Sequence, residues 1–407
     1  MTRASDLARL MGAGGTLNAA LSVDTISEKT SGSGVTIDSL NIKDSGIGGQ
    51  HIGGRRNMII NGAMQVAQRG TSTTGLGADG SSYNTCDRWD TNFLNTAGRL
   101  TMSQVSDVHD GFSKALKLDC TTADTSIAAG ELFQLMYGFE GQDLQRLKKG
   151  SSDAESVTIS FYVKGNANAT YALELYDSRR GRHASQLFNV TSSWNRISLT
   201  FTGDTSDAFD DDNALSMSMS IWLHAGSNYS SGTINGSWAA ADNTRRAAGI
   251  TSFFDSTDRT FFLTGVQMEL GSVATPFEHR SFDEERSLCQ RYFQVLFETA
   301  DANHYTALAS GRWSTNTAFY SIPLHKIMRA EPSMTVLDKD GTASSGAAGN
   351  LQGNGSNDDY TAGNMTLQSG HDGVTTISIG LDHNPSGTHA HVCYFGNGEK
   401  IHFDAEL

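Results

Sequence analysis

The stretch Val157-Thr158-Ile159-Ser160-Phe161-Tyr162-Val163 is typical of a β-strand, because it is built largely from β-branched and aromatic residues. Runs of the same kind recur at residues 58–60, 115–118, 171–176, 194–201, 215–223 and 260–269. Turn-rich stretches separate these runs, and no helical pattern of about 10–15 residues lies between them. We therefore expect residues 57–280 to form one all-β domain, a jelly-roll sandwich, rather than a parallel βαβ fold.

The amino-acid composition agrees with an all-β chain and argues against several classes of function. Glycine accounts for 43 of the 407 residues, which is typical of a protein with many turns. The formal net charge of −14 repels phosphate, so we expect no nucleic-acid partner. No apolar run approaches the roughly 18 residues of a membrane-spanning helix, so we expect no membrane insertion. The four cysteines, at positions 86, 120, 289 and 393, are scattered, which favours buried thiols over a disulfide framework.

Three further regions flank the predicted β domain. Residues 1–56 are rich in glycine and poor in large apolar side chains, so we expect a fibrous N-terminal stem that needs a partner. A capping box that begins at Ser281 and ends at Glu284 predicts a connector helix over residues 281–297. Residues 298–407 contain further strand-like runs and are expected to form a second, smaller β-sandwich.

Aromatic residues beside small polar ones are candidates for glycan or receptor binding, because aromatic rings stack on sugars while short polar side chains bond the hydroxyl groups. Tyr229 and Trp238 flank a Gly/Ser loop in the large domain, whereas Trp222 alternates with apolar neighbours and is expected in the core. In the C-terminal region, a turn that carries a Trp and an Arg is a common composition for a binding surface. The candidates there are Tyr305, Arg312, Trp313 and Tyr320. For each aromatic candidate, packing beneath a loop is the alternative.

Two groups of residues are candidate metal ligands. The aspartate-rich loop at 203–213 offers hard oxygen ligands for Ca²⁺, although it lacks EF-hand spacing and a solvated loop is the alternative. Its candidate ligands are Asp207, Asp210, Asp211 and Asp212. His389 and His391 lie two residues apart, so on a strand they face the same side. On the three-fold axis of a homotrimer such a pair would supply an octahedral metal site, with ordinary surface histidines as the alternative.

No sequence motif of an enzyme is present. The chain lacks G-x-S-x-G, H-E-x-x-H, a phosphate-binding loop, and a G-x-G-x-x-G after a strand. Carboxylates are plentiful, so a glycosidase pair stays open, but no pair stands out and we expect no catalysis. The triplet Asp87-Arg88-Trp89 is interpreted as structural, an Asp–Arg pair that holds the tryptophan against the core, with a ligand site as the alternative.

Several short phrases occur in a fixed order along the chain: Asn57–Gly70, Asp87–Trp89, Phe262–Gly271, Ala274–Ser281, Cys289–Phe293 and Phe403–Leu407. This set resembles tail fibre and receptor-binding proteins of tailed bacteriophages, especially the short-tailed, T7-like marine ones. The opening segment Thr25–Asp38 also resembles the stem segment of such fibres. The resemblance covers most of the chain and is weakest over residues 298–400.

The resemblance implies a virion protein that is synthesised in the host cytoplasm and assembles as a homotrimeric fibre. Residues 1–56 would join the phage tail, an adaptor or another fibre protein. The large domain would be a carbohydrate-binding jelly roll, and residues 298–407 would be the receptor-binding tip. Such a protein would attach the virion by multivalent, non-covalent binding of a host surface polysaccharide or other receptor.

Two other functions stay open. A polysaccharide-depolymerising tailspike would normally show the regular repeat of a parallel β-helix, and no such repeat is present. A purely structural virion fibre would make no contact with a receptor.

Overall fold

The structure is a computed structural model, and it describes residues 31, 35–37, 40–43, 46–47, 50–51, 55–296, 306–312, 317–337, 350–352, 359–361, 365–367, 376–382, 392–395 and 400–407. Side chains are described at positions 55–296, 323–335, 337 and 400–407. The chain divides into two compact units, Met1–Gly54 and Arg55–Leu407. In the described residues, no helix is both long enough and apolar enough to cross a bilayer.

The first unit contains a small antiparallel sheet of four short strands in the order β1-β2-β3-β4. The strands are β1 (Val35–Ile37), β2 (Leu40–Lys43), β3 (Gly46–Ile47) and β4 (Gln50–His51).

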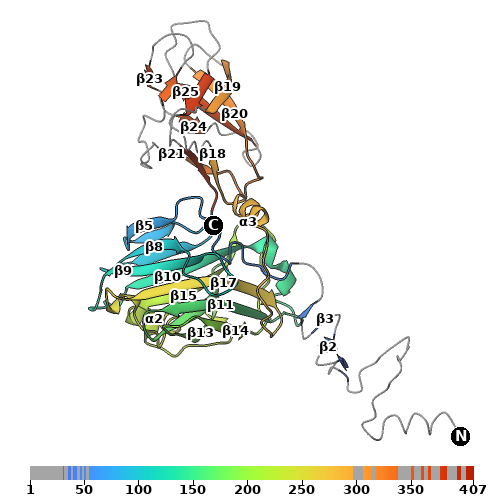
Figure 1. Ribbon diagram of the computed structural model, residues 1–407. Coiled ribbons are helices and arrows are strands. Elements are labelled where there is room, and N and C mark those ends of the chain that lie inside the picture. Colours follow the sequence, from blue (N-terminus) through green and yellow to red (C-terminus); the bar gives the residue numbers. More distant parts are fainter. Residues whose placement is uncertain are drawn as a thin grey trace, which may run out of the picture. The chain divides into compact units, whose positions relative to one another are not determined.

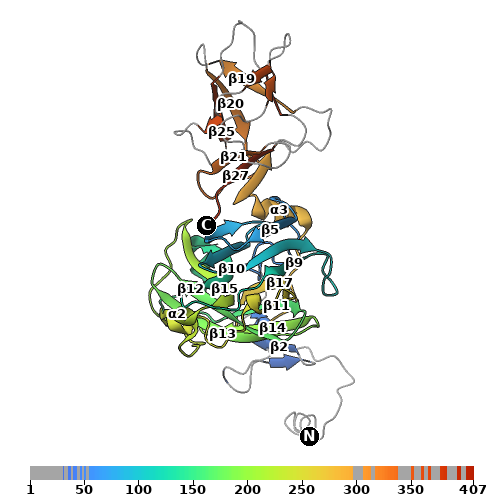
Figure 2. The ribbon, with the colours of Figure 1, turned by 90° about the vertical axis from the view of Figure 1, so that its left-hand side faces the viewer.

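The second unit is dominated by a sandwich of two antiparallel sheets, which confirms the predicted all-β jelly-roll class (Figures 1 and 2). The seven-stranded sheet has the order β16-β13-β12-β15-β10-β7-β6. Its strands are β6 (Gly80–Tyr83), β7 (Asp90–Leu94), β10 (Leu132–Glu140), β12 (Ala169–Asp177), β13 (Arg182–Val190), β15 (Leu215–Ala225) and β16 (Ala239–Ala240). The six-stranded sheet has the order β14-β11-β17-β9-β8-β5. Its strands are β5 (Ser72–Leu76), β8 (Arg99–Val105), β9 (Ala115–Thr122), β11 (Val157–Gly165), β14 (Asn195–Phe201) and β17 (Thr260–Leu270).

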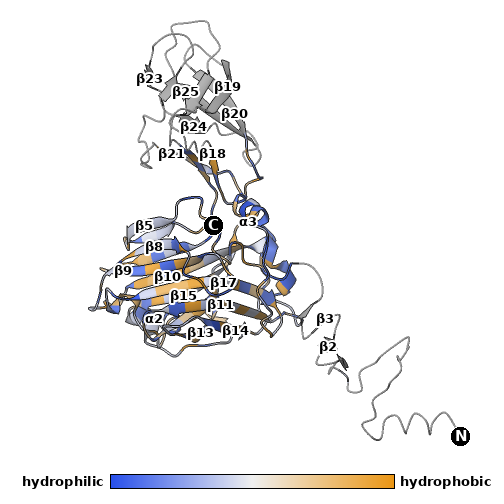
Figure 3. Ribbon diagram, in the orientation of Figure 1, coloured by the Kyte–Doolittle hydropathy of each residue, from blue (hydrophilic) through white to orange (hydrophobic). Residues whose placement is uncertain are grey.

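The core lies between the two sheets and follows from alternation along the strands. On β11, Ile159 and Phe161 are fully buried in the core, while Thr158, Ser160 and Tyr162 point to the opposite side. Figure 3 shows orange and blue residues interspersed along the strands of the sandwich, as this alternation requires. Cys86, Cys120 and Cys289 are buried free thiols, as predicted, and the side chain of Cys393 is outside the described ones.

Helices are short and lie between strands. In the described residues, the α-helices are α2 (Ser227–Ser230) and α3 (Phe282–Cys289), and the 3₁₀ helices are η1 (Gly141–Leu147), η2 (Asn243–Arg245) and η3 (Phe253–Asp255). Ser281 caps α3 as predicted, because its side chain accepts a hydrogen bond from the Glu284 N–H.

The predicted helix over residues 281–297 is too long. Helix α3 ends at Cys289, and β18 (Phe293–Leu296) follows it. The apolar residues of this segment fit the spacing of a helix and of a strand, and pairing with β27 (Lys400–Asp404) decides for the strand.

The remaining strands lie after α3 in small antiparallel sheets. A three-stranded sheet has the order β18-β27-β21, a five-stranded sheet the order β24-β25-β20-β19-β26, and a two-stranded sheet pairs β22 with β23. The strands are β19 (Thr306–Arg312), β20 (Thr317–Pro323), β21 (Ser333–Leu337), β22 (Asn350–Gln352), β23 (Asp359–Thr361), β24 (Met365–Leu367), β25 (Thr376–Asp382) and β26 (Val392–Phe395).

The phrase Asn57–Gly70 is not a strand, although residues 58–60 predicted one. It packs along β17 instead, where the Val266 N–H donates to Gly62 O at 2.9 Å. A Cβ atom at position 62 would lie only 2.1 Å from the carbonyl oxygen of Val266, so the close approach of the two backbones requires glycine here. The phrase therefore forms part of the framework that holds the sandwich together.

The triplet Asp87-Arg88-Trp89 is structural, but the predicted Asp–Arg pair does not form. Arg88 is 1% exposed and forms an ion pair with Glu406, near the end of the chain, and its guanidinium lies 3.5 Å from the centroid of the Tyr292 ring. Asp87 instead accepts a hydrogen bond from the Gln68 N–H at 2.9 Å. Burial raises the pKa of Asp87 to about 6. Contacts between distant phrases therefore fix the triplet in place.

Candidate functional site

The side of the seven-stranded sheet that points away from the core carries small and polar side chains. On β15, core residues alternate with Ser216, Ser218 and Ser220, which therefore point outward. Residues that pair with these serines on β10 and β12 point the same way. We call this surface the polar face and define it by Ser81, Tyr83, Asp90, Asn92, Gln134, Met136, Glu174, Tyr176, His183, Ser185, Ser216, Ser218 and Ser220.

Strand pairing arranges the polar face in rows. In one row Ser220 lies between Glu174 and Met136. In the next row Gln134 lies beside Asn92, whose Nδ2 donates to Gln134 Oε1 at 2.9 Å. Asn92 and Met136 are half-buried, whereas Ser220, Gln134 and Glu174 are almost fully covered. The rows therefore present partly exposed groups directly beside buried polar ones.

Several buried polar atoms of this face have no hydrogen-bond partner in the part of the chain that the structure describes. They are Asp90 Oδ1, Gln134 Nε2, His183 Nε2 and the Oγ atoms of Ser185, Ser216 and Ser220. Burying a polar group without a partner costs free energy, so water or a bound molecule normally completes such hydrogen bonds. The set combines an acceptor, a donor and hydroxyl groups that can do both, which matches the chemistry of sugar hydroxyls.

An ionised group lies at one side of the polar face. The Glu174 carboxylate accepts hydrogen bonds from Arg246 Nε and Nη2 and from Trp222 Nε1, each at 2.8 Å. Burial acts to raise the pKa of Glu174, but the hydrogen bond from His183 and the charge of Arg246 outweigh it and lower the pKa. The Arg246 guanidinium lies 4.5 Å from the centroid of the Tyr176 ring. Because Arg246 and Tyr176 are half-buried, they present a fixed cation and an aromatic ring at the surface.

The outward side of the six-stranded sheet is different. We call it the aromatic face, because it gathers the rings of His109, Phe112, Tyr162, Phe277 and His279, with neighbouring centroids between 4.1 and 6.4 Å apart. The 271–280 segment supplies hydrogen bonds here. The Thr275 N–H donates to Glu269 Oε1 and the Glu278 N–H to Gln267 Oε1, each at 2.8 Å. The chain itself therefore satisfies the carboxylate and the amide oxygen on this side.

The two predicted glycan-binding residues of the large domain do not come together. Tyr229, in α2, is half-buried and packs on Trp222, with ring centroids 5.4 Å apart. Trp238 packs against the main core and lines a cavity of about 20 Å³. Trp222 is fully buried, as predicted.

The other predicted binding residues lie in less completely described parts of the chain. Tyr305 and Trp313, and the histidine pair His389 and His391, lie outside the described residues. Arg312 and Tyr320 lie on β19 and β20, whose side chains at these positions are not described.

In the aspartate-rich loop, two of the four predicted calcium ligands form ion pairs with arginines. Asp210 forms ion pairs with Arg179 and Arg180, at 2.7 and 2.8 Å, and Asp212 pairs with Arg179 at 3.1 Å. The other two candidates, Asp207 and Asp211, are exposed. This geometry gives calcium binding at the loop no support, and the calcium site stays a prediction.

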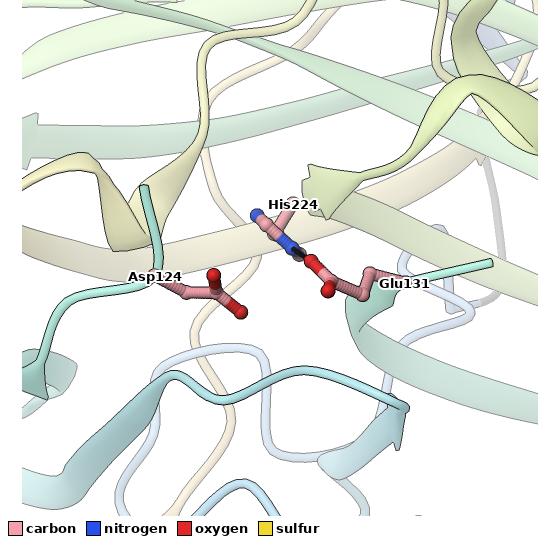
Figure 4. A group of neighbouring side chains, drawn as sticks. All are labelled: Asp124, Glu131 and His224. Atoms are coloured by element: carbon pink, nitrogen blue, oxygen red, sulfur yellow. Dashed lines mark hydrogen bonds and ion pairs between the residues drawn. The ribbon is translucent and has the colours of Figure 1, made fainter. Parts of the chain in front are cut away.

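Metal-ligating groups gather elsewhere, at one end of the sandwich. Ligand atoms of Asp124, Glu131 and His224 all lie within 4.8 Å of one another, and all three residues are buried. Figure 4 shows the three side chains turned toward one shared space. His224 Nε2 lies 3.1 Å from Glu131 Oε2, and Nδ1 lies 2.8 Å from the Ser252 hydroxyl.

The surroundings of this cluster favour an ionised aspartate and a neutral imidazole. Burial lowers the pKa of His224, although Glu131 acts to raise it. Burial acts to raise the pKa of Asp124, but hydrogen bonds from the Ala97 N–H and the Thr96 hydroxyl lower it overall. No local sequence pattern marks these residues, because Asp124 and Glu131 are far from His224 along the chain and only the fold brings the three together.

Comparison with known proteins adds a loose likeness of fold. No family model matches the chain, and no curated protein matches it. Among solved structures, a family 4 carbohydrate-binding module has 14% identity and a TM-score of 0.28, over 52% of this chain and 97% of that one. TmCBM61 in complex with β-1,4-galactotriose has 12% identity and a TM-score of 0.28, over 53% and 99%. The family 11 module of Lic26A-Cel5E from Clostridium thermocellum has 14% identity and a TM-score of 0.25, over 50% and 100%.

Proposed function

We propose that this chain is a bacteriophage tail fibre protein that attaches the virion to its host, and that the polar face of the sandwich binds a surface glycan. The observation that carries the glycan proposal is the group of buried hydrogen-bonding atoms on this face that have no partner among the described residues. The ordered phrases that resemble tail fibre proteins support the virion role.

The chemistry of the polar face suits a saccharide. An extended glycan would meet the half-buried groups first, with one sugar ring beside Tyr176 and Arg246 and another unit bonding Asn92, three strands away. Asp90 and Gln134 lie beside Asn92 and still have hydrogen-bonding capacity. One such site would bind weakly, and a homotrimeric fibre would raise the total strength through effective concentration.

The proposal is binding without catalysis, and one set of assays separates it from the alternatives. The purified chain is applied to an array of bacterial surface polysaccharides, and the bound glycans are then checked for release of reducing sugar ends. We expect saturable binding without release. Release of reducing ends would identify a depolymerising tailspike, and the absence of binding to any glycan or host cell would favour a purely structural fibre.

The homotrimer is tested separately by the native mass from light scattering. The fibre proposal predicts a mass near three times the 43.6 kDa of one chain. A monomer at micromolar concentration would contradict the trimeric fibre and leave a free-standing glycan-binding protein.

A further inference from the structure

We propose that Asp124, Glu131 and His224 form a binding site for one divalent transition-metal ion of the zinc type. Asp124 and Glu131 lie at the two ends of the loop between β9 and β10, His224 lies at the end of β15, and the three side chains converge at one point (Figure 4). This inference is independent of glycan binding.

The spacing of the ligand atoms suits a shared metal. Imidazole and carboxylate ligands bind Zn²⁺ at about 2.0–2.2 Å, which places neighbouring ligand atoms roughly 3–3.5 Å apart. His224 Nε2 and Glu131 Oε2 are 3.1 Å apart, and the Asp124 carboxylate lies within 4.8 Å of both. A small movement of one carboxylate therefore completes a set of three ligands, with a fourth position for water.

The charges of the cluster also call for a cation. Asp124 and Glu131 are two buried carboxylates, and in the described residues neither forms an ion pair with a lysine or an arginine. Two other buried glutamates of the sandwich do have one, Glu174 with Arg246 and Glu140 with Arg291, whereas Glu269 is held by hydrogen bonds from Thr275. Two neighbouring buried carboxylates without a lysine or an arginine are costly to keep ionised, and a divalent ion would neutralise them.

Neighbouring groups hold the ligands in orientation, as the outer shell of a metal site does. The Ser252 hydroxyl lies 2.8 Å from His224 Nδ1, which leaves Nε2 directed at the cluster. The Thr96 hydroxyl and the Ala97 N–H both donate to Asp124 Oδ2, at 3.0 and 2.7 Å. One imidazole with two carboxylates favours zinc over calcium, because calcium takes six to eight oxygen ligands.

A metal at this position would fasten the loop 124–131 to the end of β15. The same loop already bonds the segment that follows β15, since the Gly226 N–H donates to Glu131 O at 2.8 Å and the Asn228 N–H to Ala129 O at 2.9 Å. Asn228 lies in α2 beside Tyr229, which packs on Trp222. Metal binding would therefore stiffen the end of the sheet that carries the polar face.

The test uses the full chain, free of affinity tags, stripped with a chelator and titrated with Zn²⁺. We expect one Zn²⁺ to be held per chain, and His224→Gln or Glu131→Gln to weaken that binding by at least about 100-fold. Ser252→Ala should weaken it by about 10-fold, because it removes only the orienting partner. His183→Gln is the matched control, since His183 also lies 3.1 Å from a buried glutamate, but that glutamate already has an arginine. Equal Zn²⁺ affinity in the wild type and in His224→Gln would overturn the proposal.

A second measurement covers the case in which the ligand variants fail to fold. Hydrogen–deuterium exchange of the unaltered chain is followed with and without Zn²⁺. Peptides that cover 124–131 and 220–228 should exchange more slowly with Zn²⁺, while peptides of the aromatic face should not change. Slowing confined to other peptides, or no slowing at all, would contradict a metal site at this position.

Discussion

On the aromatic face, the chain's own 271–280 segment bonds Glu269 and Gln267, whereas on the polar face Asp90 and Gln134 keep buried atoms that have no partner in the described part of the chain. Both faces belong to one sandwich, so the jelly-roll fold alone does not decide where polar groups go unpaired. The comparison teaches that a side whose carboxylate and amide oxygens are already bonded by the chain serves the framework. A side left incomplete is the better candidate for binding a ligand.

The framework role of the aromatic side extends to the ends of the domain. Glu278, in the 271–280 segment, accepts the Asn57 N–H at 2.7 Å, and Arg280 donates to Ile59 O at 2.9 Å. Arg280 also pairs with Glu285 of α3, at 3.2 Å. The phrases that resemble tail fibre proteins thus meet in these contacts, which indicates that they encode the framework rather than the binding surface.

The largest expected effect comes from breaking a framework ion pair. Glu406→Gln leaves the buried Arg88 without its carboxylate partner, and we expect it to lower the free energy of unfolding by about 3–5 kcal/mol. Asp107→Asn is the control, because Asp107 is 55% exposed in its pair with Lys164 and should cost less than about 1 kcal/mol. Urea denaturation measures both, and a cost for Glu406→Gln as small as that of the control would contradict the framework role.

The next effect contrasts two buried carboxylates by their response to pH. The pKa of Asp87 is raised from 3.8 to about 6. The contribution of Asp87 to the free energy of unfolding is therefore fully present below pH 3.8 and is lost as pH rises through about 6. At about 1.4 kcal/mol per pKa unit, this amounts to about 3 kcal/mol. The pKa of Glu174 is lowered, so its stabilisation is present above pH 4.5 and is lost as pH falls through the folded pKa.

Measurement of unfolding against pH in two variants checks this contrast. Relative to wild type, Asp87→Asn should gain stability as pH rises from 4 to 6, because the variant lacks a carboxyl that becomes charged in the core. Glu174→Gln should be destabilised near neutral pH, and that loss should shrink below pH 4.5. If the free energy of unfolding varied with pH in the same way for the wild type and Asp87→Asn, the pKa of Asp87 would be the same in the folded and unfolded chains, which would contradict this prediction.

The smallest effect compares one hydroxyl from each face. Thr158, next to the aromatic face, donates to Gly271 O at 2.8 Å, so Thr158→Val should lower the free energy of unfolding by about 1 kcal/mol. Ser220 Oγ is buried and has no partner among the residues that the structure describes, so Ser220→Ala should leave stability unchanged or raise it by up to about 1 kcal/mol. A loss in Ser220→Ala equal to that in Thr158→Val would mean that the Ser220 hydroxyl has a partner in the folded protein.

The sequence predicted what depends on local pattern. The run at residues 215–223 indicated a strand, and the capping box at Ser281 located the start of α3. It did not predict that Arg88 pairs with Glu406, because 318 positions separate the two residues. It placed the glycan candidates at Tyr229 and Trp238 by their aromatic character, yet both pack on apolar clusters. Strand register creates the polar face, and register cannot be derived from a single strand.

The most direct test of the central claim compares the two faces for glycan binding. A glycan that binds the wild-type chain is titrated calorimetrically into Tyr176→Ala and Asn92→Ala, with Tyr162→Ala of the aromatic face as the matched control. All three side chains are half-buried, so the folding cost should be similar. We predict that the two polar-face variants lose at least about 10-fold in affinity while Tyr162→Ala binds like the wild type. Loss of binding in Tyr162→Ala, with Tyr176→Ala and Asn92→Ala unaffected, would contradict the account.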